Sequence, residues 1–157
     1  MDHSGRGAHQ EHFPTTEAAV AALHAVAAEH GREIEVTHDI GADQTSRRSA
    51  AGFGVTTDPD GSLPHEAYAE FGGLPRVSVR LFPEDDALIT VEGVVFHDVP
   101  RDDVPAFLHS VFGGLAHVRG RSFPPTASLV VPLAGDRTYR EHLAAHLLTP
   151  WLSSRMR

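Results

Sequence analysis

The chain has 157 residues, 41% of them hydrophobic, which suits one domain with a sizeable core. Its formal net charge of −8 argues against general nucleic-acid binding, because such proteins draw most of their affinity from a basic face. The absence of Cys excludes disulfides and thiolate chemistry, and no apolar run reaches the roughly 18 residues of a membrane span, so we expect no membrane partner.

The choice of polar residue types in the chain is unusual. All thirteen basic residues are Arg, and the chain contains neither Lys nor Asn. Because Lys and Asn codons are A-rich, this bias indicates a GC-rich bacterial genome of the actinobacterial type, and the same bias favours the twelve His. The first dozen residues contain no apolar run of the kind found in secretory leaders, so we expect a cytoplasmic protein.

The N-terminal part predicts a tail, a helix and a strand. Residues 1–12 are polar and include three His, which predicts a disordered tail. Thr15 or Thr16 can cap a helix that runs to about His30 through an Ala-rich segment. Residues 33–38 then alternate apolar and polar side chains, as a half-buried strand does.

The pattern between residues 51 and 71 is weaker. Residues 51–57 predict a strand that contains two Gly, and the sequence DPDG at 58–61 predicts a turn. Residues 65–71 fit either one helical turn or an edge strand. These segments are therefore expected to add to a sheet whose centre lies further along the chain.

The clearest pattern lies between residues 76 and 133. The alternation at 77–81 predicts a strand, and a turn at 83–86 leads into a long strand at about 87–98. Gly93 interrupts the alternation of that second strand and is followed by three apolar residues. A β-bulge at Gly93 would explain both features, because one extra residue inverts the facing of the side chains.

Two further helices are predicted. Asp102 or Asp103 can cap one that ends at the Gly pair at 113–114. Asp136 can cap the other, which covers 137–148 and stops before Pro150.

The segments around the last helix complete the prediction. Residues 115–121 fit a short strand or a loop, and 127–133 predict a strand that Pro132 places at an edge or a bulge. The fold expected is α+β, a single two-layer domain at 13–152 with a mainly antiparallel sheet and three helices, followed by a polar tail at 153–157.

The spacing of two histidines suggests a divalent metal site. His142 and His146 are four residues apart, so they share one side of the predicted last helix and could bind one ion. A zincin motif would need Glu directly after the first His, and Leu143 occupies that position. Further ligands would come from His97 or His117, and the alternative is an ordinary margin of an amphipathic helix.

A cationic segment suggests a site for a small anionic ligand. If residues 117–121 are extended, His117, Arg119 and Arg121 lie on one face. Guanidinium groups bind carboxylate and phosphate through paired hydrogen bonds. The alternative is a solvated edge strand, where exposed Arg is common.

No catalytic motif emerges from the sequence. Adjacent strand residues face opposite sides, so His97 and Asp98 are not expected to pair, and no Ser lies in a nucleophile elbow. We therefore expect a small acidic binding protein, of an accessory, regulatory or immunity type, that recognises a protein partner with a basic surface. The alternative is a small enzyme or ligand-binding protein that uses the metal or the anion site; the oligomeric state stays open.

Overall fold

The computed structural model describes residues 11–39, 65–123 and 125–157. Within them, eight antiparallel strands form two sheets, and three α-helices accompany the sheets. The α+β class predicted from the sequence is therefore confirmed, but there are two sheets where one was expected. The strand expected at 51–57 and the turn expected at 58–61 lie outside the described residues.

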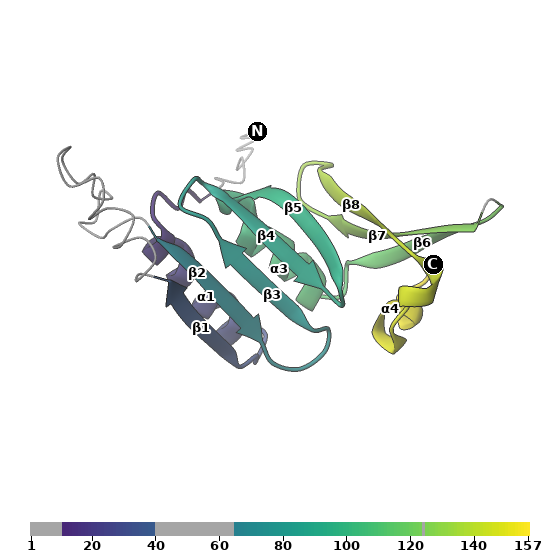
Figure 1. Cartoon of the computed structure of the whole chain (residues 1–157), viewed down its shortest axis with the longest axis horizontal. Helices are drawn as coiled ribbons and strands as arrows, with labels where there is room; N and C mark the ends of the chain where they lie inside the picture. The colour runs from purple at the N-terminus through teal and green to yellow at the C-terminus, as the bar shows by residue number, and fades with distance from the viewer. Residues whose placement is uncertain (1–10, 40–64, 124) are drawn as a thin grey trace, which may run out of the picture.

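The first five strands form a sheet, here called the large sheet, in which every strand pairs with the next along the chain (Figure 1). The segment at 65–71 is a strand, as one of its two interpretations held, but it lies inside the sheet and not at its edge. The hairpin predicted from the alternation at 77–81 is confirmed. The strands are β1 (Ile34–Asp39), β2 (Glu66–Phe71), β3 (Val77–Leu81), β4 (Asp86–Val91) and β5 (Val94–Pro100).

Gly93 lies in a turn between two strands and not in a bulge. Val91 pairs with Val94, so Glu92 and Gly93 form a two-residue turn with φ of 49° and 83°. Positive φ at both positions is what a type I′ hairpin turn requires. The register irregularity lies elsewhere in this hairpin, where Asp98 of β5 adopts a φ of 54°.

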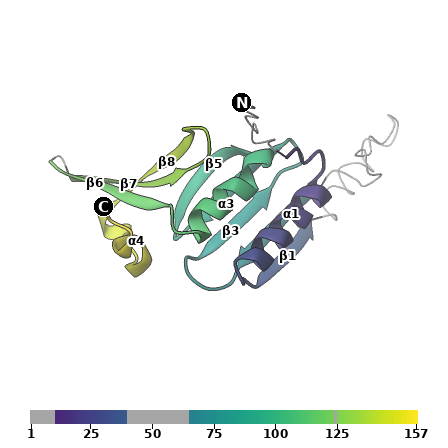
Figure 2. The same cartoon turned by 180° about the vertical axis from the view of Figure 1, so that it is seen from behind.

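Two helices cover one face of the large sheet, and no helix of the described residues covers the other face, here called the open face (Figures 1 and 2). The helices are α1 (Thr16–Glu29) and α3 (Val104–Phe112). The predicted cap of α1 is confirmed, since the Ala18 N–H donates to Thr15 Oγ1 at 3.0 Å. The apolar faces of both helices join a core that also contains side chains from both sheets.

The capping of α3 expected from Asp102 or Asp103 is not observed, since no side-chain capping bond is made to its first turn. Both carboxylates bond instead to segments distant in the sequence. Asp102, the middle residue of the short helix η1 (Arg101–Asp103), accepts the Phe13 N–H at 2.8 Å and is bonded to His12 at 2.7 Å. His12, expected in a disordered tail, is thus attached to the domain.

Asp103 lies at the junction between the two sheets and is 3% exposed. Arg137 donates to both of its carboxylate oxygens, at 2.9 and 3.0 Å, and the Tyr139 hydroxyl donates to it at 2.6 Å. Burial and then this hydrogen bond raise the pKa of Tyr139. The carboxylate therefore ties the start of α3 to the last strand of the second sheet.

The second sheet, here called the small sheet, follows α3 and packs beside β5 through its last strand. Its central strand is the one in which Pro132 suggested an edge or a bulge, and the proline occupies the last position of that strand. The strands are β6 (His117–Ser122), β7 (Pro125–Pro132) and β8 (Thr138–Leu143).

The helix predicted at 137–148 is wrong. Strand β8 occupies its first half, a 3-10 turn η2 (Ala145–Leu147) follows, and the last α-helix, α4, is Pro150–Ser154. Asp136 does not cap a helix but lies in the turn before β8, with a φ of 58° next to a Gly at 72°. The burial of β8 alternates from residue to residue, as a strand with one buried face requires.

The C-terminal residues pair with the outer edge of β6. The Val118 N–H donates to the Arg155 carbonyl at 2.9 Å, and the Arg157 N–H donates to the Val118 carbonyl at 3.0 Å. The segment expected to be a polar tail is therefore hydrogen-bonded to the small sheet. Among the residues placed by the structure, no helix has the length and apolar character required to span a bilayer.

Candidate anion-binding site

One face of the small sheet gathers cationic side chains from two of its strands. The register aligns Arg119 of β6, Ser128 of β7 and His142 of β8 in one row across the sheet. Residues directly opposite each other in a sheet point to the same face, and so do residues two apart in one strand. Arg121 and Arg140 therefore share the face of this row.

These side chains surround a hollow of about 540 Å³, here called the arginine hollow. Its volume falls within the range of about 300–1,000 Å³ that is typical of small-molecule sites. The Arg and His side chains that line it are exposed, whereas Ser128 is 8% exposed. The hollow is lined by Arg119, Arg121, Thr126, Ser128, Arg140 and His142.

The charge in the arginine hollow is of one sign. Glu141 is the only acidic residue in the three strands, and the alternation of β8 places it on the opposite face. Among the described residues, arginine–carboxylate ion pairs engage Arg80, Arg101 and Arg137, and none engages the arginines of the hollow. Three guanidinium groups thus face solvent together on a chain whose net charge is −8.

The hollow also contains a hydrogen-bonded serine and histidine. Ser128 Oγ and His142 Nδ1 are 3.1 Å apart, and the tautomer of the ring decides which of them donates. A serine nucleophile needs such a base, and the base is usually oriented by a third group. No such group is bonded to His142 in the described part of the chain.

The sequence predicted part of this site. Arg119 and Arg121 share one face of an extended segment, as expected, and both line the hollow. His117 shares their face but not the hollow, because its Nδ1 donates to the Leu115 carbonyl at 3.0 Å. Arg140 was missed because its segment was predicted to be a helix, and the charged Glu141 between Tyr139 and Leu143 interrupts the apolar alternation that would have indicated a strand.

The histidines predicted to share a metal ion are separated. His142 is in β8 and His146 in the 3-10 turn η2, so the helical spacing on which that hypothesis depended does not exist. His97 is exposed on β5 and lines a different hollow, on the open face, together with Asp98. Groupings of three potential ligand atoms occur instead at two other places within the described residues.

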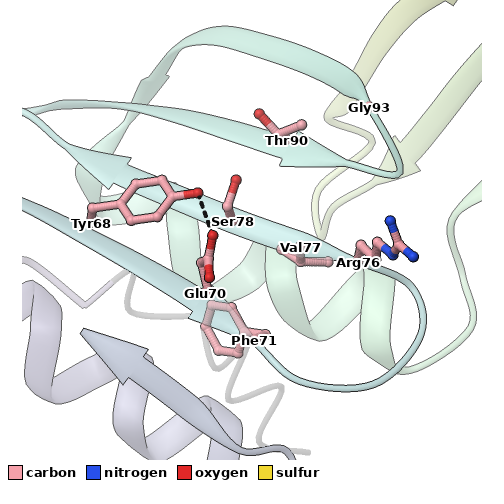
Figure 3. A pocket seen from close by; sticks show the side chains of 8 residues that line it. All are labelled: Tyr68, Glu70, Phe71, Arg76, Val77, Ser78, Thr90 and Gly93. Carbon is pink, nitrogen blue, oxygen red and sulfur yellow. Dashed lines mark hydrogen bonds between the residues drawn. The ribbon is translucent and has the colours of Figure 1, made fainter. Parts of the chain in front are cut away.

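The open face of the large sheet carries hollows of a different character. One of about 270 Å³ lies over β2, β3 and β4 and mixes acidic, basic and neutral side chains. Figure 3 shows the Tyr68 hydroxyl directed at the Glu70 carboxylate, to which it donates a hydrogen bond of 2.9 Å, with Ser78 and Thr90 on the neighbouring strands. The polar groups on this face partly satisfy one another.

Comparisons of the chain with protein-family models, with curated proteins and with solved structures found no match. The function therefore has to be inferred from the geometry and charge of the chain itself.

Proposed function

We propose that the protein is a binding protein that holds an anionic ligand in the arginine hollow. The observation that carries this proposal is the convergence of Arg119, Arg121 and Arg140 on one hollow without a carboxylate partner among the described residues. Like charges repel one another, and the repulsion is relieved when an anion occupies the space between them. The ligand class is a small molecule or a segment that bears phosphate or carboxylate groups.

The chemistry of the lining supports this ligand class. Each guanidinium presents a planar fork of donors that matches two oxygens of a carboxylate or a phosphate. Ser128 and Thr126 add hydroxyl groups from the central strand of the small sheet, and His142 adds a ring nitrogen. A ligand with two or more anionic groups would engage arginines from β6 and β8 at once, which explains why the cations come from both outer strands of the small sheet.

The proposal is tested by calorimetric titration of the full chain with pyrophosphate and with citrate. We expect one molecule of at least one probe to bind, with an affinity that falls as salt is added. Replacing Arg119 or Arg140 by Ala should weaken binding by about tenfold, since a hydrogen bond between charged groups contributes roughly 1.5–3 kcal/mol. Circular dichroism of each variant checks that the fold is intact.

The matched controls are Arg76→Ala and Arg80→Ala on the open face, which remove the same charge elsewhere. They should leave the affinity within about twofold, because exposed charges separated by more than about 10 Å are screened. Equal losses from both sets of variants, or no binding of either probe at low salt, would contradict an anion site in the arginine hollow.

A second candidate function is recognition of a protein partner with a basic surface through the open face. The observation that favours it is the acidic lining of that face, where hollows of about 410 and 330 Å³ share Glu66, and Glu84 and Asp86 line the former. Capture of a partner from the native host should then weaken in the variant Glu66→Arg and at high salt. Capture that is insensitive to both changes would exclude this face as the docking surface.

A further inference from the structure

The C-terminal ends of α1 and α3 bring together two histidines and a glutamate, here called the helix-end cluster. His30 is the C-cap residue of α1, directly after Glu29, and His109 lies in the last turn of α3. His30 Nε2 and His109 Nδ1 are 2.9 Å apart, and Glu29 Oε2 is 3.7 Å from the same His109 nitrogen. The three ligand atoms all lie within 4.8 Å of one another.

These separations are close to those of a metal site. Ligand atoms bound tetrahedrally to Zn²⁺ at 2.0–2.1 Å lie about 3.3 Å from one another. The separations of 2.9 and 3.7 Å from His109 Nδ1 fall on either side of that value, and the third separation, between the ligand atoms of Glu29 and His30, is at most 4.8 Å. Two imidazoles and one carboxylate are also a ligand set that zinc uses in proteins.

The surroundings of the cluster favour a cation in two ways. Helix C-termini carry partial negative charge, and two of them lie at this place. The His30 ring also packs at tilted angles against His109 and Phe112, with centroids 5.2 and 5.6 Å apart, which limits how far it can rotate away. The positive charge of Arg32 acts against cation binding. Its guanidinium lies 4.5 Å from the centre of the Phe112 ring and donates to backbone carbonyls of the β2–β3 turn.

We propose that Glu29, His30 and His109 form a binding site for Zn²⁺ or a divalent ion of similar ligand preference. The side chain of Glu29 is 66% exposed and that of His109 is 40% exposed, so a fourth position would face water or an exchangeable ligand. The site is independent of the arginine hollow and does not rest on the proposed function. It would join the two helices that cover the large sheet.

A second grouping of one Glu and two His could also bind a metal ion, and the test has to distinguish it from the helix-end cluster. At the other end of α1, Glu17 Oε1 is 3.6 Å from His65 Nε2 and 4.0 Å from His38 Nδ1, and the two ring nitrogens are 2.8 Å apart. Metal uptake by the whole chain therefore cannot distinguish the two groupings, and the test has to compare variants of each.

The experiment is titration of the untagged full chain with Co²⁺, followed by its visible absorption, and with Zn²⁺ by calorimetry. We expect a Co²⁺ band of the tetrahedral type and a loss of affinity of about 100-fold or more in His109→Gln and in Glu29→Gln, because a direct ligand contributes at least as much as the outer groups that orient it. The controls are His24→Gln, an exposed residue of the same helix, and His38→Gln, which removes one ligand of the second grouping; neither should lower the affinity that His109→Gln removes.

Side-chain nitrogen NMR spectra test the proposal on the parent protein itself, so the result does not depend on whether a variant folds. Zn²⁺ should shift the resonances of His30 Nε2 and His109 Nδ1 first. A loss of affinity in His38→Gln with none in His109→Gln, unchanged spectra of both rings, or the absence of binding would each overturn the proposal.

Discussion

Each of the two sheets presents a face to solvent, and the two faces differ in how their charged side chains are arranged. On the open face of the large sheet, Arg80 lies 4.0 Å from Glu66 and Tyr68 donates to Glu70, so polar groups of both kinds are interspersed. In the arginine hollow of the small sheet, cations gather without acidic neighbours on the same face. Interspersed charges stabilise the fold only weakly, whereas a concentration of charge of one sign costs free energy that the binding of an oppositely charged ligand can offset.

A buried arginine, Arg101, makes the same contrast. Arg101 is 3% exposed, and its guanidinium donates to the carbonyls of Phe13, Phe82 and Pro83 while pairing with Asp85 at 3.1 Å. Both terminal nitrogens of this structural guanidinium thus have acceptors from the protein itself. Among the described residues, no carboxylate forms an ion pair with the arginines of the hollow, which is the arrangement that the proposed anion site requires.

The largest expected effect comes from removing the cations of the hollow together. The triple variant with Arg119, Arg121 and Arg140 replaced by Ala should weaken binding of the best anionic probe by about 1,000-fold, or roughly 4 kcal/mol. The double variant Arg76→Ala, Arg80→Ala on the open face is the matched control and should bind within about twofold of the parent. Calorimetric titration measures both, and a similar loss in the control would remove the distinction between the faces.

The next largest effect concerns the junction that holds the two sheets together. Asp103→Ala should lower the free energy of unfolding by about 2 kcal/mol, because it removes acceptors from Arg137 and Tyr139. Tyr139→Phe should cost about 1 kcal/mol, as it removes one of those hydrogen bonds. Urea denaturation measures both values. Equal stabilities of the two variants would show that the ion pair contributes nothing beyond the hydroxyl.

A smaller effect is expected inside the hollow. Ser128→Ala removes the group that orients His142 but leaves all three guanidiniums in place. Affinity for the anionic probe should fall by roughly fivefold, in line with the approximately 1 kcal/mol of a neutral hydrogen bond. Titration of this variant beside Arg140→Ala gives the comparison, and a loss from Ser128→Ala that exceeds the loss from Arg140→Ala would show that charge is not the main determinant of binding.

The smallest effect is the pH dependence that Asp102 contributes. Burial alone would raise its pKa, but the hydrogen bonds from His12 and the Phe13 N–H outweigh burial and lower it. A carboxylate with a lowered pKa stabilises the fold above its unfolded value of about 3.9, and the stabilisation is lost as the pH falls through the lowered folded value. The stability difference between the parent and Asp102→Asn should therefore be constant near neutral pH and shrink below about pH 4, as urea denaturation across pH would show.

The sequence predicted correctly those helices and strands whose capping residues and side-chain periodicity indicate the same structure. The cap at Thr15 and the alternation at 77–81 depend only on neighbouring residues, and both are confirmed. The helix predicted at 137–148 failed because Tyr139 and Leu143 are four apart, a spacing that satisfies the helical period and also places both on one face of a strand. The Gly–Asp turn at 135–136, with positive φ at both residues, excludes a helix that begins at Asp136.

The candidate sites differ in how far a sequence can predict them. Arg119 and Arg121 are two residues apart in one strand, so their common face follows from alternation. Arg140 joins them only through the pairing of β7 with β8, which depends on tertiary structure. His30 and His109 are 79 residues apart and meet only because α1 and α3 pack against the same sheet.

The most direct test of the anion site is amide chemical-shift mapping of the full chain during titration with pyrophosphate. If the arginine hollow binds the anion, the largest shifts should fall on β6, β7 and β8 around Arg119, Ser128 and His142, while the open face stays unchanged. Shifts concentrated on β2 to β5, or small shifts spread evenly over exposed arginines, would contradict a site in the small sheet.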